Sequence, residues 1–271
     1  MASVVVGVLL SAGCTSSPEP HLSLGRPTVA GVTTGTRGQG EEIDPRACYR
    51  AGLLHARCGR HERAVSSFTK AITLDPELAE AYMERGVALL ALRSIPAAIE
   101  DLSKALELRV RSPGQAHYWR AVALSSQDLR HAAIQDLDSA INLKYALDQS
   151  LTLRAMLHFE MGEYNLAIAD FTNALANSPS SYEAHLGRGM VWSKLDQDKL
   201  ALGDFDAAAI LRPEAGEPHY HRAVVWFGLQ RWPKALEACD MALSAASLNL
   251  DVQDATLELR ELVLEEQAED N

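Results

Sequence analysis

The stretch AAIEDLSKALEL at residues 97–108 returns at residues 132–143 as AAIQDLDSAINL, with the same apolar positions and the same aspartate. Four more stretches follow this pattern, so that six copies occur at a spacing of 34 or 35 residues: RAVSSFTKAITL from residue 63, LAIADFTNALAN from 166, LALGDFDAAAIL from 200 and KALEACDMALSA from 234. A period of this length predicts a solenoid of two-helix units. Each unit is too small to bury its own apolar face, so neighbouring units must stack.

Small residues recur at the places where the two helices of a unit would cross. The first helix of each unit, helix A, has one such position, filled by Gly52, Gly86, Ala121, Ala155, Gly189 and Ala223. The second helix, helix B, opens on Ala64, Ala98, Ala133, Ala167, Ala201 and Ala235, and later has Ala71, Ala105, Ala140, Ala174, Ala208 and Ala242. Between these two positions lies Phe68, Leu102, Leu137, Phe171, Phe205 or Cys239. Because protein interiors are close-packed, we expect that side chain to fill the space that the small residues leave.

In this combination the chain resembles the tetratricopeptide repeat (TPR) proteins, whose signature is a small residue in helix A, then Ala, a large apolar residue and Ala in helix B, then Pro. The terminal proline is kept as Pro76, Pro179 and Pro213 and is absent from the other copies. The resemblance implies an all-α fold, a right-handed superhelical solenoid of stacked helix-turn-helix units in residues 45–249. Its six repeats are expected at 45–78, 79–112, 114–147, 148–181, 182–215 and 216–249.

The remaining C-terminal segment, residues 250–271, is predicted to be a capping helix that covers the last repeat and ends in an acidic tail. Its apolar residues fall at helical spacing on one face: Val252, Ala255, Leu259, Leu262 and Val263.

The first fourteen residues, MASVVVGVLLSAGC, resemble a bacterial lipoprotein signal. An apolar stretch from Val4 to Leu10 is followed by three small residues and by Cys14, which would be lipidated. Residues 1–13 carry no Lys or Arg, which a start codon chosen too late would explain. The alternative is an ordinary apolar N-terminus with a chance cysteine. Residues 14–44 are rich in Ser, Thr, Gly and Pro and are predicted to form a flexible tether.

Composition and motifs exclude several classes of function. The formal net charge is −11, so the chain lacks the excess of basic residues that binding to nucleic acid requires. No apolar run approaches the roughly 20 residues that span a bilayer. There is no HExxH, GxSxG or phosphate-binding loop, and no CxxC or metal-ligand cluster. The histidines fall into repeat positions that favour structural roles. We therefore expect a protein that is not an enzyme and needs no cofactor or metal.

Charged residues also recur at a fixed register. Five copies carry an arginine in helix A, at Arg85, Arg120, Arg154, Arg188 and Arg222, and four carry an aspartate in helix B, at Asp101, Asp136, Asp170 and Asp204. Pairing within a repeat and pairing with the following repeat each satisfy four of the five arginines, so the sequence leaves both open. We expect a structural ladder, with an exposed ligand site as the alternative. We therefore expect structural roles for the following residues: Arg120, Asp136, Gly86, Gly189, Ala98, Ala133, Ala167 and Ala201.

The TPR resemblance also implies a concave groove lined by helix A residues, which here are apolar. The candidate partner-binding residues are Tyr49, Met83, Val87, Tyr118, Val122, Met156, Phe159, Met190, Tyr220 and Phe227. Aromatic and methionine side chains suit an apolar peptide segment or an amphipathic helix. The alternative is that the curvature of the superhelix, or the chain's own tether, buries them. The Lys, Asn and Arg clamp that chaperone-binding members use on a terminal carboxylate is absent.

Together these features predict a protein-protein interaction adaptor or scaffold, held at a bacterial envelope membrane by a lipid on Cys14 and otherwise outside the bilayer. The alternative is a cytoplasmic TPR scaffold without lipidation. An enzyme that uses the solenoid as its scaffold is a third interpretation, for which the sequence offers no catalytic constellation.

Overall fold

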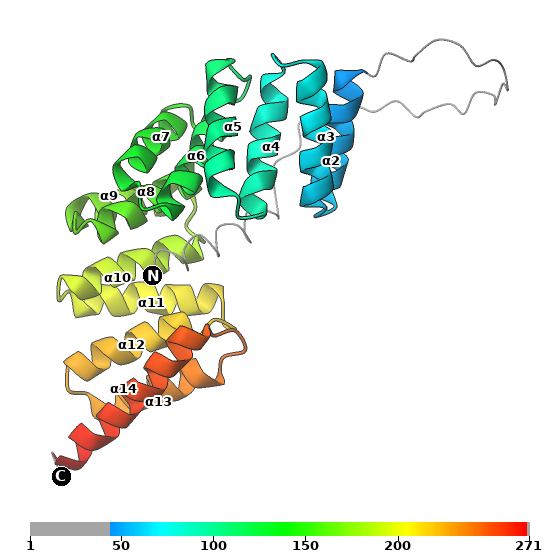
Figure 1. Ribbon diagram of the computed structural model, residues 1–271. Coiled ribbons are helices and arrows are strands. Elements are labelled where there is room, and N and C mark those ends of the chain that lie inside the picture. The colour runs from blue at the N-terminus through cyan, green and yellow to red at the C-terminus, as the bar shows by residue number, and fades with distance from the viewer. Residues whose placement is uncertain (1–43, 270–271) are drawn as a thin grey trace, which may run out of the picture. The chain divides into compact units, whose positions relative to one another are not determined.

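The computed structural model describes residues 44–269. The predicted signal at residues 1–13, Cys14 and all of the predicted tether except Asp44 lie outside the described residues. Within them the chain forms thirteen helices, and its only β-type pairing is an isolated bridge between Ala215 and Ser247. In chain order the helices are α2 (Pro45–Arg57), α3 (His61–Leu74), α4 (Ala79–Ala91), α5 (Ile95–Glu107), α6 (Pro113–Ser126), α7 (Arg130–Asn142), α8 (Leu147–Glu160), α9 (Tyr164–Asn177), α10 (Tyr182–Lys194), α11 (Asp198–Leu211), α12 (Glu217–Gly228), α13 (Trp232–Ser244) and α14 (Leu250–Glu269) (Figure 1).

Consecutive helices pack as pairs that match the sequence repeats. Helix A of a repeat packs on its own helix B, as α4 does on α5 and α10 on α11, and a helix B also contacts the helix A that follows, as α3 does α4 and α9 does α10. The predicted all-α solenoid of stacked TPR units is confirmed. The chain divides into two compact units between residues 133 and 134, with α2 to α6 in the N-terminal unit, α8 to α14 in the C-terminal unit and α7 containing the division.

The small residues of helix A lie where a neighbouring side chain leaves no room for a Cβ atom. A Cβ built on Gly86 would lie 2.8 Å from Leu102 Cγ, and one on Gly189 would lie 2.7 Å from Phe205 Cε1. The helix B alanines Ala98, Ala133, Ala167 and Ala201 are all fully buried. The crossing is therefore closed by a glycine or alanine on one helix and a large apolar side chain on the other.

The turn from helix A to helix B has the same backbone in all six repeats. One residue in each turn adopts a left-handed conformation with φ between 54° and 77°: Gly59, Arg93, Asp128, Gly162, Asp196 and Gln230. Only two of them are glycine, although glycine meets the smallest steric penalty there. The repeat therefore imposes this turn even on residues that disfavour it.

The turn from helix B to the next repeat depends on the proline. Where Pro76, Pro179 or Pro213 is present, the preceding residue that ends helix B is extended, with φ of −140° or −135°, as expected before proline. In the second and third repeats, which lack the proline, Arg109 and Lys144 adopt left-handed φ of 57° and 54° instead. Two different local solutions thus end helix B at the same register.

Helix α14 covers the last repeat, but the predicted buried face needs one correction. Val263 is fully buried and Leu259 packs against α12 and α13 side chains, as expected. Leu262 is 48% exposed, so its assignment to the buried face was wrong. Thr256 is buried instead, and its hydroxyl donates a hydrogen bond to the carbonyl of Val252 at 2.6 Å. That bond satisfies the hydroxyl inside the helix, which lets a polar residue occupy an apolar face.

Candidate protein-binding surface

The candidate groove residues of the C-terminal unit lie on the helix A segments α8, α10 and α12. Helix α10 contacts both α8 and α12, so these three segments are neighbours. Five of these candidate residues are partly exposed, and we call them the helix A surface: Met156, Phe159, Met190, Tyr220 and Phe227. Val224, on the same face of α12, is 38% exposed. This surface presents thioether and aromatic groups without burying them.

Neighbouring aromatic rings hold the side chains of the helix A surface in place. The ring of Phe159 packs against Tyr164 at a centroid distance of 5.9 Å, and that of Phe227 packs against Trp232 at 5.5 Å. In both cases the partner ring opens the helix B of the same repeat. Met190 packs on the core cluster around Phe205. These contacts hold the side chains from the core side, and the side chains stay partly exposed to solvent.

The same register in the N-terminal unit behaves differently. Met83 is 4% exposed, Tyr118 6% and Val122 1%, so these three predicted groove residues are core side chains. Tyr49 and Val87 are partly exposed, as the residues of the helix A surface are. Burial, together with the negative charges of Glu84 and Glu80, raises the pKa of Tyr49 to about 12. Three of the five groove residues predicted in the N-terminal unit are therefore inaccessible to a partner.

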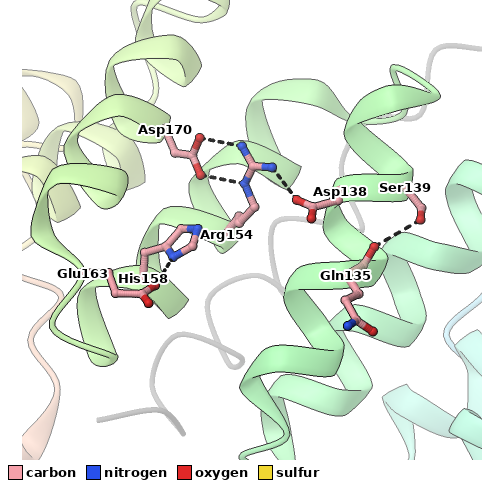
Figure 2. Close-up of polar contacts among 7 residues, drawn as sticks. All are labelled: Gln135, Asp138, Ser139, Arg154, His158, Glu163 and Asp170. Carbon is pink, nitrogen blue, oxygen red and sulfur yellow. Dashed lines mark hydrogen bonds and ion pairs between the residues drawn. The ribbon is translucent and has the colours of Figure 1, made fainter.

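The recurring arginines form a ladder of charge-assisted hydrogen bonds, shown for Arg154 in Figure 2. Arg154 donates through Nε and Nη2 to the two carboxylate oxygens of Asp170, both at 2.7 Å, and through Nη1 to Asp138 of the preceding repeat. The guanidinium therefore binds two carboxylates at once. The bond to Asp170 is the main cause of the raised pKa of Arg154, so this arginine stays charged.

The same geometry recurs in other repeats and settles how the arginines pair. Arg85 and Arg188 each bind the aspartate of their own repeat through Nε and Nη2, and use Nη1 for the preceding repeat. The preceding repeat always contributes the helix B residue two places after the aspartate position: Thr69 to Arg85, Ser103 to Arg120, Asp138 to Arg154 and Thr172 to Arg188. Arg85, Arg154 and Arg188 thus each join the two helices of their own repeat and link that repeat to the preceding one.

Two ionisable residues that the sequence did not single out share one register of helix A. Burial raises the pKa of Glu84 to about 7, and burial lowers the pKa of His221 to about 4. The His221 ring stacks on Phe205 at 5.3 Å with an interplanar angle of 17°. The other four repeats have Arg50, Trp119, Leu153 and Gly187 here. Because this position carries no common residue type, the repeat pattern gave no signal for its chemistry.

Two of the histidines at repeat positions, His185 and His158, have local partners. His185 lies 3.0 Å from Asp204 and 3.1 Å from the carbonyl of Pro179, and His158 lies 2.6 Å from Glu163 (Figure 2). In the part of the chain that the structure describes, no group of three or more His, Cys, Asp or Glu residues is arranged to hold a metal ion. None of the helices in that part is long and apolar enough to cross a bilayer.

Comparison with known proteins agrees with this architecture. Two human proteins are similar over 54% of this chain: tetratricopeptide repeat protein 13, 24% identical over 17% of its length, and tetratricopeptide repeat protein 6, 23% identical over 35% of its length. The chain therefore spans only a minor part of these relatives.

Solved structures share the fold at low sequence identity. YrrB, described as a TPR protein with an unusual peptide-binding site, superposes with a TM-score of 0.57 at 22% identity, covering 72% of this chain and 97% of its own. The pilF protein of Pseudomonas aeruginosa gives a TM-score of 0.66 at 18% identity, covering 81% of this chain and 100% of its own. The tetratricopeptide repeat family model matches residues 49–116, 152–208 and 197–249, more than half of the sequence. The chain belongs to the tetratricopeptide repeat family.

Proposed function

We propose that this protein is a non-enzymatic adaptor that binds an apolar segment or an amphipathic helix of a partner protein on its helix A surface. TPR proteins generally mediate protein-protein interactions. The observation that carries the proposal is the partial exposure of Met156, Phe159, Met190 and Phe227 on neighbouring helices of one unit. Aromatic residues dominate binding hot spots, and methionine adapts to apolar partners.

The likeness to YrrB supports a peptide as the form of the partner, since that protein is described as having a peptide-binding site. An extended or helical segment that buries four such side chains removes apolar area from water on both molecules. Each fully buried methionine or phenylalanine side chain contributes about 1.5–3 kcal/mol of transfer free energy, before the cost of association.

The test compares two Glu substitutions in the full chain. Met190→Glu puts a charge on the helix A surface, whereas Ile210→Glu puts the same charge on α11 at a side chain that is 79% exposed and outside that surface. Proteins captured by the wild type and by Ile210→Glu, but lost with Met190→Glu at equal helical content, support the proposal. Equal capture by both variants contradicts it.

We further propose that the adaptor is anchored to a bacterial envelope membrane through lipidated Cys14, on the evidence of the MASVVVGVLLSAGC sequence. The alternative is a cytoplasmic scaffold without a lipid. Palmitate label retained by the wild type and absent from Cys14→Ala, with Cys14→Ala recovered in the soluble fraction, supports the anchor. A wild-type protein that is already soluble and begins at Met1 or Ala2 excludes it.

A further inference from the structure

The sixth repeat departs from the arginine ladder at one residue. It keeps the helix A arginine, Arg222, but Ala238 occupies the helix B position that holds Asp101, Asp136, Asp170 and Asp204 in the four preceding repeats. The alanine cannot accept the two hydrogen bonds that an aspartate at this position receives through Nε and Nη2.

The Arg222 guanidinium consequently lies differently from its counterparts. Its Nε atom is 3.1 Å from a carboxylate oxygen of Asp206, the residue of the preceding repeat, yet it is buried and has no hydrogen-bond partner. Nη1 lies 3.3 Å from Nδ1 of His219. Since arginine only donates, that nitrogen must be the acceptor of a neutral imidazole. Burial and the charge of Arg222 lower the pKa of His219, which keeps the imidazole neutral.

A pocket of about 170 Å³ lies at this position in the fold. Its lining combines the arginine and the substituted alanine with side chains of α12 and α13: Arg222, Trp226, Lys234, Glu237, Ala238 and Met241. The volume is many times the roughly 10–15 Å³ that a cavity needs to hold one water, so a carboxylate and its adjoining methylene fit. The Lys234 ammonium lies 4.3 Å from the centre of the Trp226 ring and adds a second positive charge. Glu237 is the one acidic residue of the lining.

Arg154 shows what the complete arrangement looks like (Figure 2). It binds two carboxylates, Asp170 from its own repeat and Asp138 from the preceding one. For Arg222, Asp206 is the counterpart of Asp138, and the counterpart of Asp170 is replaced by Ala238 and the pocket. One guanidinium in this fold can therefore hold a second carboxylate beside the one it already contacts.

We propose that the pocket beside Ala238 binds the side-chain carboxylate of an aspartate or glutamate from a partner peptide, which takes the place that Asp170 occupies in the fourth repeat. The guanidinium of Arg222 turns to the orientation of Arg154 and Arg188, and donates to both carboxylate oxygens. Lys234 contributes the second cation, and Trp226 and Met241 contact the methylene stem. The site shares no residue with the helix A surface, so it stands whether or not that surface binds a partner.

The test uses the full chain and small probes. N-acetyl-aspartate methylamide is titrated while the Nε–H resonance of Arg222 is followed by NMR, with N-acetyl-asparagine methylamide as the uncharged probe of the same shape. We expect a saturable shift for the aspartate probe and at least about tenfold weaker binding of the asparagine probe, because bonds to a charged acceptor are stronger. N-acetyl-alanine, which carries a terminal carboxylate, is expected to bind more weakly than the aspartate probe.

Two variants keep the result interpretable. Ala238→Asp supplies the carboxylate from the chain itself, so it should fold, raise the melting temperature and abolish probe binding. Ala238→Asn fills a similar volume without charge and should not raise the melting temperature. The proposal is overturned if the aspartate probe leaves the Arg222 resonance unshifted, if the asparagine probe binds equally well, if N-acetyl-alanine binds more tightly than the aspartate probe, or if binding survives in Ala238→Asp.

Discussion

The two compact units place the same helix A register in different surroundings. In the N-terminal unit Met83, Tyr118 and Val122 are buried, whereas in the C-terminal unit Met156 and Met190 are partly exposed. Three residues after Val122 and its equivalents, Leu90 and Ser125 are also buried, whereas Phe159, Ser193 and Phe227 are partly exposed, as is Ala56 in the first repeat. A register position therefore sets the face of a helix on which a side chain lies, and the packed neighbours decide whether a partner can reach it.

Thr152 is the exception within the C-terminal unit. It is buried at 5% exposure, and its hydroxyl donates a hydrogen bond to the carbonyl of Asp148 at 2.8 Å. This side chain therefore bonds within its own helix and is not part of the helix A surface, to which α8 contributes Met156 and Phe159.

The largest expected effect comes from removing one carboxylate of the arginine ladder in the C-terminal unit. Asp170→Ala leaves Arg154 without its main partner in a pair whose side chains are only 22% and 8% exposed. We expect the free energy of unfolding, measured by urea denaturation, to fall by about 3–5 kcal/mol. The matched control is Asp240→Ala, which removes the exposed pair with Arg260, and there we expect a much smaller loss because solvent screens the pair. Equal losses in both variants would show that burial does not set the strength of the ladder.

The second prediction concerns close packing in the C-terminal unit. A Cβ on Gly187 would lie 2.3 Å from Phe171 Cζ, whereas a Cβ on Gly203 meets nothing within 4 Å. Gly187→Ala should therefore lower the free energy of unfolding by about 1–3 kcal/mol. Gly203→Ala should raise it by about 0.5–1 kcal/mol, because alanine favours the helix. Chemical denaturation of both variants checks this, and a stabilised Gly187→Ala would contradict the close contact between α10 and Phe171 of α9.

The third prediction concerns the pH dependence of stability, which should differ between a residue of the N-terminal unit and one of the C-terminal unit. The pKa of Glu84, in the N-terminal unit, is raised from 4.5 to about 7, so the folded state binds a proton more tightly than the unfolded state. Its contribution to stability is present below pH 4.5 and is lost as the pH rises through 7. Glu84→Gln should therefore stabilise the protein at pH 8, by on the order of 1–2 kcal/mol, and have little effect at pH 4.

His221, in the C-terminal unit, gives the opposite dependence. Its pKa is lowered from 6.5 to about 4, so its contribution is present above pH 6.5 and is lost as the pH falls through 4. His221→Phe should keep the stack on Phe205 and remove this loss at acid pH. Melting curves of both variants at pH 4, 6 and 8 check the pair of predictions. Identical pH profiles for Glu84→Gln and His221→Phe would contradict the two local environments.

The sequence predicted the features that all repeats share. Helix crossings at Gly86 and Gly189, the buried helix B alanines and the structural use of the arginines follow from residue types that recur at one spacing. The features it missed arise where one repeat differs from the rest. The pKa of Glu84, the burial of Val122 and the pocket beside Ala238 depend on packing between particular neighbours, which no periodic pattern encodes. Leu262 was misplaced because it adjoins the buried Val263 on α14, and periodicity alone does not separate adjacent residues at the edge of a face.

The most direct test of the proposed binding surface uses two substitutions of the same kind, Met190→Ala in the C-terminal unit and Met83→Ala in the N-terminal unit. For each variant, the affinity for a captured partner is measured per folded molecule beside the melting temperature. We predict that Met190→Ala weakens binding more than about fivefold, or roughly 1 kcal/mol, with its melting temperature little changed. Met83→Ala should instead lose about 2–5 kcal/mol of stability through a cavity, with its affinity unchanged. Lost stability with unchanged affinity in Met190→Ala would contradict the helix A surface as the binding site.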